Sequence, residues 1–316
     1  MSELLKNVDA RTKLAGTNKL EILLFTLGVD QRSNRRETFG INVFKVREVM
    51  RTPEITQAPE MPASVEGMVS LRGQLVPVID LAKYAGITTG NKPEIMIVSE
   101  YNGHTQGFLV EAVDTILRLD WTSMRVPPDM LTCQMGGLVT AVTELEDGKL
   151  VMLMDVEKVL AETSGAGQTI DENMVIKNKK LADKTVFFSD DSAVARKQIE
   201  MTLNAMGIHY LQTINGKRAW DELLRIAQAA DIQSKPVKDF VQLILTDVEM
   251  PEMDGYMLTK MIKSDPRFAG IPVIMHSSLS GMSNQKLGQS VGVDGYVAKF
   301  EPHKLSEMIA EYLLRD

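Results

Sequence analysis

The sequence predicts two domains of different fold class: an all-β domain first, then an α/β domain with a doubly wound parallel sheet. Two observations predict this order. The first half contains short strands in which apolar and polar residues alternate, separated by turn residues. The last third instead alternates continuous apolar strands with helical segments. At 316 residues the chain is long enough to give each domain its own core.

The N-terminal half is predicted to be built from small closed barrels, because many short strands follow one another at close spacing. Its clearest strands are Leu20–Phe25, Phe39–Phe44 and Gln74–Ile79. Asn102-Gly103 and Asp147-Gly148, each flanked by apolar residues, predict hairpin turns. A helix-like stretch, Ser2–Leu14, precedes the first strand.

A small, polar segment beginning at Ser164 separates the two halves. It reads Ser-Gly-Ala-Gly-Gln-Thr and runs into a charged, helix-like stretch that ends at Lys184. This composition is typical of a linker. We therefore expect a first domain over 1–163, a linker over 164–182 and a second domain over 183–316.

Two apolar strands of the second domain each end in acidic residues. Thr185–Ser189 is followed by Asp190 and Asp191, and the second strand, which begins at Val241, ends in Asp247. Open α/β sheets bind ligands just beyond the carboxyl ends of such strands. If the strands are neighbours, the three carboxylates converge and their repulsion demands a cation. Carboxylate oxygens are the ligands that Mg²⁺ prefers.

Two further strands bring a hydroxyl and an ammonium group to the same edge. Ile271–His276 ends at Ser277, and Gly295–Ala298 leads into Lys299. These are the groups that a phosphoryl group on Asp247 would need. Taken singly, each feature is more often a helix cap, a turn or a surface cation. Their occurrence in order on successive strands favours the functional interpretation.

Together these residues resemble the receiver domains of two-component response regulators, over about 183–316. The resemblance implies a flavodoxin-like fold in which Asp247 accepts a phosphoryl group from a phosphohistidine of a partner kinase. The implied Mg²⁺ ligands are Asp190, Asp191, Asp247 and the backbone carbonyl of Glu249. The residues implied to bind the phosphate or to switch are Ser277, Tyr296 and Lys299.

Two positions leave alternatives open. Receivers usually have a cis proline after the lysine, but Phe300 follows Lys299 here. A cis bond before a residue other than proline costs about 3–4 kcal/mol, so we expect a trans bond or a rearranged loop. Tyr296 is as compatible with a core aromatic at a strand end as with a moving switch.

In the first domain the most informative segment is Met61–Leu81. Gly67 and Gly73 would permit tight bends in it, and Arg72 would be displayed beside one of them. This segment resembles the CheW-like chemotaxis coupling domain, a resemblance that spans about 19–163. It implies two small five-stranded, SH3-like β-barrels that bridge chemoreceptors and their histidine kinase. It also implies that Arg72, supported by Gly67 and Gly73, contacts the receptor tip.

Composition excludes several other classes. The net charge of −7 and the pI near 5.3 argue against a nucleic-acid partner, which would require a basic surface. The single cysteine, Cys133, excludes an internal disulfide. No apolar stretch approaches the length of a membrane span and the N-terminus has no signal-peptide pattern, so we expect a cytoplasmic protein without direct membrane insertion.

A coupling domain followed by a receiver resembles the CheV-type chemotaxis scaffold proteins. The implied function is an adaptor, recruited to membrane chemoreceptor arrays, whose phosphorylation on Asp247 modulates kinase coupling or serves as a phosphate sink. Such a protein is not an enzyme beyond self-catalysed phosphoryl transfer and hydrolysis. One alternative is a scaffold that is never phosphorylated. Another is an aspartyl-phosphate phosphatase, disfavoured because that family needs an aspartate where Glu249 stands.

Overall fold

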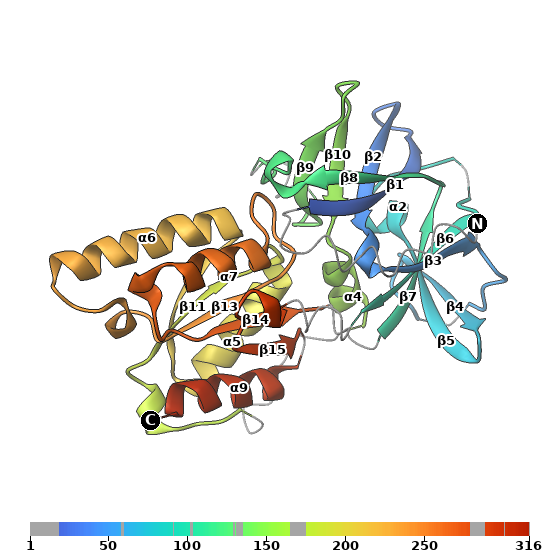
Figure 1. Ribbon diagram of the computed structural model, residues 1–316. Helices are drawn as coiled ribbons and strands as arrows, with labels where there is room; N and C mark the ends of the chain where they lie inside the picture. Colours follow the sequence, from blue (N-terminus) through green and yellow to red (C-terminus); the bar gives the residue numbers. More distant parts are fainter. Residues whose placement is uncertain are drawn as a thin grey trace. The chain divides into compact units, whose positions relative to one another are not determined.

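A computed structural model describes most of the chain as two compact units (Figure 1). One is built mainly from Leu20–Leu119 and Ser123–Ala166, and the other mainly from Gly167–Asp316. The described residues are 19–57, 60–90, 92–101, 104–128, 130, 135–164, 175–278, 288–299 and 301–315. Within these ranges no helix is long and apolar enough to cross a membrane.

Some of the expectations fall outside the described residues. They concern the helix-like stretch 2–14, the turn pair Asn102-Gly103, Cys133 and Phe300. The strands on either side of the turn pair are described, and they form the expected hairpin, with Tyr101 opposite His104.

The N-terminal unit contains two five-stranded sheets, the number of strands that the resemblance to the CheW-like coupling domain implies. The first has the order β8-β1-β2-β10-β9 and comprises β8 (Ala112–Asp120), β1 (Lys19–Asp30), β2 (Arg35–Asn42), β10 (Leu150–Met154) and β9 (Val139–Glu144). The second has the order β3-β6-β7-β5-β4 and comprises β3 (Val46–Arg51), β6 (Ile95–Tyr101), β7 (His104–Val110), β5 (Gln74–Asp80) and β4 (Val65–Leu71). Among its described residues, the helices of this unit are η1 (Val43–Lys45), α2 (Leu81–Tyr84) and α4 (Val156–Ser164), and the short turn η2 (Trp121–Ser123) follows β8.

One apolar core joins the two sheets of this unit. Phe25 and Phe39 lie opposite each other on β1 and β2, with ring centroids 6.0 Å apart. Phe108 of β7 and Val159 of α4 belong to the same buried cluster. Each large side chain that is fully buried contributes about 2–3 kcal/mol of transfer free energy. The core therefore holds both sheets and α4 together as one domain.

One predicted strand ends earlier than expected. The alternating pattern from Phe39 to Phe44 predicted a strand throughout, but β2 ends at Asn42. The Asn42 side chain accepts a hydrogen bond from the backbone N–H of Phe44 at 3.0 Å, and the chain then forms the 3₁₀ turn η1. Asparagine side chains compete with strand pairing in this way, which an apolar alternation does not reveal.

The C-terminal unit has an all-parallel five-stranded sheet, which confirms the doubly wound α/β prediction. Its strands, in spatial order, are β12 (His209–Thr213), β11 (Thr185–Ser189), β13 (Leu243–Thr246), β14 (Val273–Ser277) and β15 (Gly295–Ala298). The α-helices among its described residues are α5 (Ala193–Met206), α6 (Gly216–Ile232), α7 (Gly255–Ser264) and α9 (Pro302–Leu314), and the short 3₁₀ helices are η4 (Lys179–Leu181), η5 (Val237–Asp239) and η6 (Pro266–Phe268).

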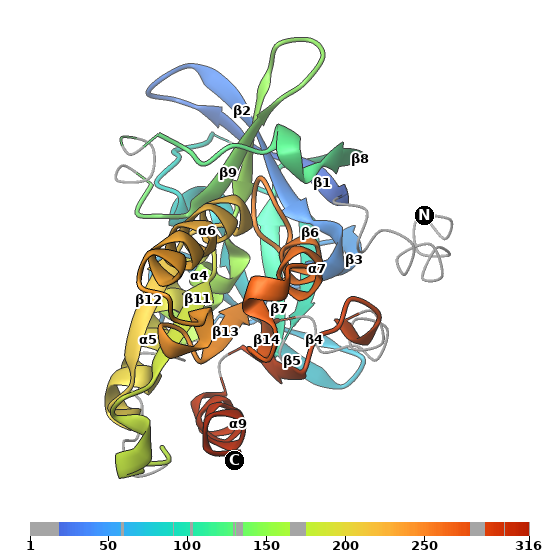
Figure 2. The ribbon, with the colours of Figure 1, turned by 60° about the vertical axis from the view of Figure 1, so that its left-hand side comes forward.

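Successive residues of β11 show how this sheet is covered on both faces. Phe187 packs into a cluster with α6 and α7, whereas Phe188 packs into a cluster with α5 and α9. Figure 2 shows the two pairs of helices on either side of the strands. Because side chains alternate along a strand, a fully apolar strand must be buried on both faces.

The α-helices of this unit begin close to the carboxyl ends of the strands, where polar residues cap several of them. Ser192, Asn215 and Asp254 each accept a hydrogen bond from a backbone N–H in the first turn, of α5, α6 and α7 respectively. α5 ends at Gly207, whose φ of 73° is left-handed. These caps fix where each helix begins, and so they restrict the loops that connect the carboxyl ends of the strands to the helices.

The end of the predicted linker packs into the C-terminal unit. Val175 and Leu181 are buried in the cluster formed with α5 and α9. Over its described part, residues 175–184, the chain forms the short turn η4 in place of the expected helix-like stretch up to Lys184. The boundary at residue 183 stays a prediction, and the burial of these two side chains bears on where it should be drawn.

Candidate functional site

The acidic residues meet because β11 and β13 are hydrogen-bonded neighbours. Ser189 pairs with Thr246, and Asp190 and Asp247 are the next residue of each strand. The Asp247 N–H donates to the Ser189 carbonyl at 2.8 Å, which continues the ladder by one step. One carboxylate oxygen from each of Asp190, Asp191 and Asp247 can be chosen so that the three atoms lie within 4.8 Å of one another. Asp190 and Asp247 are buried, and Asp191 is half-buried.

Lys299 lies between two of these carboxylates. Its Nζ is 3.0 Å from Asp190 Oδ2 and 3.1 Å from Asp247 Oδ2, and the side chain is buried. Its backbone N–H donates to the Ser277 carbonyl at 3.1 Å, so β14 holds it in place. A buried ammonium group is tolerable only when it is paired in this way. The four side chains that the sequence predicted to converge therefore share one neighbourhood.

The charge balance of this cluster suits a divalent cation. Three carboxylates face one ammonium group, and two of the three are nearly removed from solvent. Repulsion between buried carboxylates is large because the local dielectric is low. An all-oxygen set of this kind fits the hard cation Mg²⁺. Glu249 follows Asp247 by two residues, so its backbone stays close to the carboxyl end of β13, and the residue is buried.

Ser277 and Tyr296 lie beside this cluster and contact each other. Ser277 ends β14 and is buried, and its side chain is hydrogen-bonded with that of Tyr296 on the neighbouring strand β15. Burial raises the pKa of Tyr296 to about 12, with a further contribution from the negative charge of Asp247 and Glu249. Tyr296 is thus a neutral hydroxyl at the edge of the acidic site.

The helix that follows the acceptor strand requires a glycine at its start. A Cβ on Gly255 would lie 1.9 Å from the Asp247 carbonyl oxygen, closer than any real contact. The Gly255 N–H donates to the Val248 carbonyl at 2.9 Å. Only glycine lets the first turn of α7 approach the backbone of Asp247 this closely.

Three residues near the site were not expected from the sequence. His276, a buried residue of β14, has its Nδ1 3.9 Å from Asp190 Oδ2. Tyr256 of α7 is buried, and its pKa is raised, first by burial and then by Tyr296 and Glu249. Arg196 of α5 donates to the backbone carbonyls of the acidic pair. The contacts of His276 and Tyr256 depend on tertiary packing, whereas those of Arg196 are local but come from an arginine that is ordinary in the first turns of a helix.

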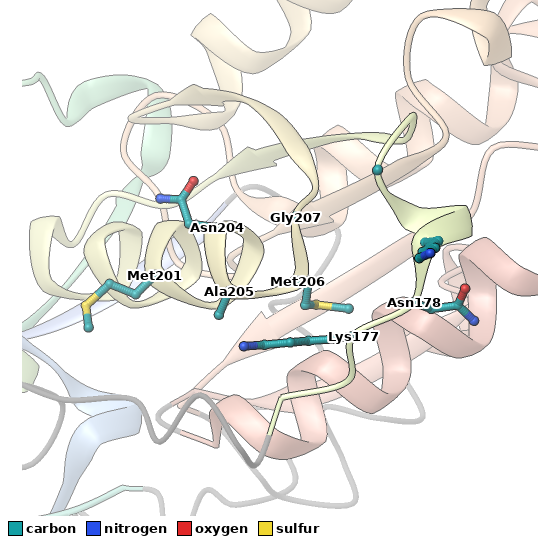
Figure 3. A pocket seen from close by; sticks show the side chains of 9 residues that line it. Lys177, Asn178, Met201, Asn204, Ala205, Met206 and Gly207 are labelled. Carbon is teal, nitrogen blue, oxygen red and sulfur yellow. The ribbon is translucent and has the colours of Figure 1, made fainter.

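A separate hollow of about 710 Å³ lies at the other edge of this sheet (Figure 3). Its lining residues are Lys177, Asn178, Lys179, Ala182, Met201, Asn204, Ala205, Met206 and Gly207. These include the C-terminal end of α5, a helix that begins beside the acidic cluster and rises about 20 Å along its axis. The hollow is therefore remote from the carboxylates, and its lining lacks their chemistry.

In the N-terminal unit, Arg72 occupies a strained turn. It joins β4 to β5 with Gly73, and both residues have positive φ, 49° and 81°. Two-residue hairpin turns of this kind favour Asn-Gly, and a left-handed arginine costs roughly 1 kcal/mol. The guanidinium is exposed and lies 2.9 Å from Glu48, and nearby Leu75 is also highly exposed. Strain at an exposed cation is a reason to look for function there.

The two glycines of this segment have different structural reasons. A Cβ on Gly67 would lie 2.2 Å from the Thr56 carbonyl oxygen, and its φ is 137°. The β4–β5 register shifts at this point, which marks a bulge. At Gly73 there is open space, and only the positive φ favours glycine. Gly67 therefore shapes β4, whereas Gly73 shapes the turn that displays Arg72.

Comparison with known families agrees with this two-part architecture. The CheW-like domain model matches residues 21–164, and the response regulator receiver domain model matches residues 186–310. Chemotaxis protein CheV3 of Helicobacter pylori is 29% identical over 94% of this chain and 95% of its own length. Chemotaxis protein CheV1 of the same organism is 27% identical over 99% of both chains. Chemotaxis protein CheW of Klebsiella aerogenes is 30% identical over 48% of this chain and 87% of its own.

Proposed function

Because the chain belongs to the CheV-type chemotaxis proteins, which join a CheW-like domain to a receiver domain, we propose that phosphorylation of Asp247 changes how it couples chemoreceptors to a histidine kinase. The protein is a chemotaxis coupling adaptor with a receiver domain. The observation that carries the proposal is the buried cluster of Asp190, Asp247 and Lys299 at one edge of the parallel sheet.

In the proposed reaction, the Asp247 carboxylate attacks the phosphorus of a kinase phosphohistidine. A P–O bond forms as the P–N bond breaks, and the imidazole leaves with the electron pair and takes up a proton. The Val248 N–H donates to Asp247 Oδ1 at 2.7 Å and orients the carboxylate. Lys299, already 3.1 Å from Oδ2, is placed to neutralise the charge that accumulates on the transferred group.

Asp190, Asp191, Asp247 and the backbone carbonyl of Glu249 would hold Mg²⁺. When bound, the ion supplies charge neutralisation to the phosphoryl oxygens. The protein residues orient the acceptor carboxylate, exclude bulk water from it and place the Lys299 ammonium group beside the transferred phosphoryl group. Asp190 and Asp247 are well suited to this because they are buried and lie on adjacent strands.

The proposed switch uses the contact between Ser277 and Tyr296. A phosphoryl group on Asp247 would attract the Ser277 hydroxyl as a donor, and Tyr296 would then lose its present partner and repack. To move the receiver from mostly off to mostly on, phosphorylation must favour one arrangement by about 5.5 kcal/mol. A receiver that serves only as a phosphate sink would accept the label without this change.

Phosphotransfer tests the central role of Asp247. The full chain is incubated with the radiolabelled phosphorylated kinase and Mg²⁺, next to Asp247→Asn and the control Asp239→Asn, an exposed aspartate of η5. We expect label on the wild type and on the control and none on Asp247→Asn. Equal label on all three would remove Asp247 from its role. Failure of the wild type to take label or bind beryllofluoride would favour a scaffold that is never phosphorylated.

We propose further that the CheW-like domain contacts the receptor tip through the β4–β5 turn. Arg72→Asn tests this sharply, because asparagine suits the left-handed turn at least as well as arginine and so preserves the hairpin. We expect about tenfold weaker binding to receptor-containing membranes, typical of losing an anchoring arginine, with phosphotransfer unchanged.

The matched control is Arg36→Asn, which removes another exposed, ion-paired arginine of the same unit. Co-sedimentation with the membranes measures binding of all three proteins. If Arg72→Asn binds as the wild type does, the turn is not the contact. If both variants lose binding equally, the effect is one of net charge.

A further inference from the structure

We propose that Arg196 is the positioning residue of the Mg²⁺ site: it holds the loop of Asp190 and Asp191 so that both carboxylates stay aimed at the ion. This inference rests on the proposed function, because it concerns the same metal. Arg196 is neither one of the proposed metal ligands nor part of the expected phosphate-binding set.

One guanidinium nitrogen makes the contact with both aspartates. Arg196 Nη1 donates to the Asp190 carbonyl at 2.8 Å and to the Asp191 carbonyl at 2.9 Å. Arg196 lies in the first turns of α5, which begins at Ala193, so its side chain reaches back to the loop that leads into its own helix. Two successive carbonyls therefore point toward one cation, on a side chain that is itself half-buried.

These two hydrogen bonds restrict the backbone of the loop between β11 and α5, and they act together with the contacts of Asp190 itself. The Asp190 N–H reaches the Thr213 carbonyl at 3.3 Å, near the outer limit for such a bond. Asp190 Oδ1 accepts the Ser192 N–H at 2.9 Å, and Oδ2 faces Lys299. By holding the carbonyls of residues 190 and 191, Arg196 restricts the backbone torsions at both aspartates. The direction in which each carboxylate leaves the backbone is restricted as a result. Hydrogen bonds that orient metal ligands are worth about 10–100-fold in metal affinity.

Arg196 also carries a permanent positive charge, which by itself would act in the opposite direction. A cation behind the acidic pair repels a second cation, so removal of charge alone would tighten Mg²⁺ binding. Positioning and charge thus make opposite predictions. Arg196→Lys keeps the charge, but its side chain is one bond shorter than the path to Nη1 and does not reach both carbonyls, and Arg196→Gln loses both the reach and the charge.

The experiment measures the Mg²⁺ dissociation constant of the full chain by isothermal titration calorimetry. Arg196→Lys and Arg196→Gln are compared with Arg225→Lys, a change at an exposed arginine of α6 that pairs with Glu222. We expect both Arg196 variants to bind Mg²⁺ on the order of 10-fold more weakly, and Arg225→Lys to bind as the wild type does. Unchanged affinity in Arg196→Lys, or tighter binding in Arg196→Gln, would overturn the inference.

A kinetic measurement separates positioning from a general loss of structure. Phosphotransfer from the kinase is followed as a function of Mg²⁺ concentration, and the urea midpoint is measured in EDTA. We expect the half-saturating Mg²⁺ concentration to rise while the rate at saturating Mg²⁺ stays near the wild-type value. A fall in the saturated rate together with a lower urea midpoint would assign Arg196 a merely structural role. If Arg196→Gln does not fold, the Mg²⁺ affinity of Arg196→Lys alone tests the inference. If the wild-type protein binds no Mg²⁺, the proposed function is overturned and not the inference about Arg196.

Discussion

At the scale of single residues, Lys299 is the side chain whose removal should have the largest effect on stability. Its ammonium group is almost fully buried and lies within 3.1 Å of two buried carboxylates. Breaking a buried ion pair from one side leaves a charge without compensation and costs about 3–5 kcal/mol. Here the remaining charges are negative, so a divalent cation can compensate for part of the loss.

We predict that Lys299→Met lowers the free energy of unfolding of the receiver unit by about 3 kcal/mol in EDTA, and that Mg²⁺ restores part of it. Urea denaturation with and without Mg²⁺ measures both effects. The double variant Asp247→Asn with Lys299→Met should lose less than the sum of the single changes, because one uncompensated carboxylate is removed. A loss of equal size in EDTA and Mg²⁺ would contradict this account.

Residues at strand ends were the easiest part of the site to predict. Asp190, Asp247 and Lys299 each follow an apolar strand, and parallel topology then brings them to one edge. Arg196 and Tyr256 lie on helices, where an arginine or a tyrosine at such a position is ordinary. The contact of Tyr256 depends on how α7 packs, and that of Arg196 on the conformation of the loop before α5, and a single sequence carries no periodic signal for either.

At the scale of secondary-structure elements, the start of α7 combines a strong cap with an electrostatic cost. The Asp254 side chain accepts the Met257 N–H at 2.6 Å, which stabilises the helix N-terminus. Burial nevertheless raises the pKa of this carboxyl from 3.8 to about 6. The folded protein therefore binds more protons than the unfolded chain between pH 4 and 6, and its stability falls as pH rises through that window.

We predict that Asp254→Asn stabilises the receiver unit at pH 8 by up to about 3 kcal/mol, because asparagine caps equally well and carries no charge. The difference between the variant and the wild type should shrink as pH falls from 6 to 4, where the aspartate becomes protonated. Urea midpoints measured across this range, at constant Mg²⁺, test the prediction. A difference that does not change with pH would rule out burial of the charge as its cause.

In the receiver sheet the sequence predicted the three central strands and the edge strand β15, but not the other edge strand, β12. β11, β13 and β14 are apolar runs inside the sheet, and the sequence predicts each of them. β12 reads His-Tyr-Leu-Gln-Thr, none of its residues is fully buried, and it was not predicted. An edge strand contacts one neighbour only and can keep polar residues, so hydrophobic patterning misses it unless, as in β15, its residues are largely apolar.

At the scale of the whole molecule, each of the two units has its own core. The start of the receiver domain lies in the segment of chain that connects them. The sequence predicts that the receiver begins at residue 183. Val175 and Leu181, which precede it, are nonetheless buried in the receiver core. Each such side chain contributes about 1.5–3 kcal/mol when fully buried.

We predict that a receiver fragment of residues 175–316 is more stable than one of residues 183–316 by about 3 kcal/mol. Urea unfolding of the two fragments gives the difference directly. In the longer fragment, Leu181→Ala should cost about 2–5 kcal/mol, whereas Lys180→Ala at the exposed neighbouring position should change little. Equal stability of the two fragments would support the boundary at residue 183.

The pairing of Ser189 with Thr246 has a consequence for how this protein can diverge or be redesigned. The spacing of the two buried acids is inherited from the fixed gap of about 4.8 Å between adjacent strands, not from loop conformation. Loops elsewhere in the receiver can therefore lengthen or change composition with little effect on this spacing. Insertion of a single residue within either strand would instead turn one acid toward the opposite face of the sheet and abolish the site in one step.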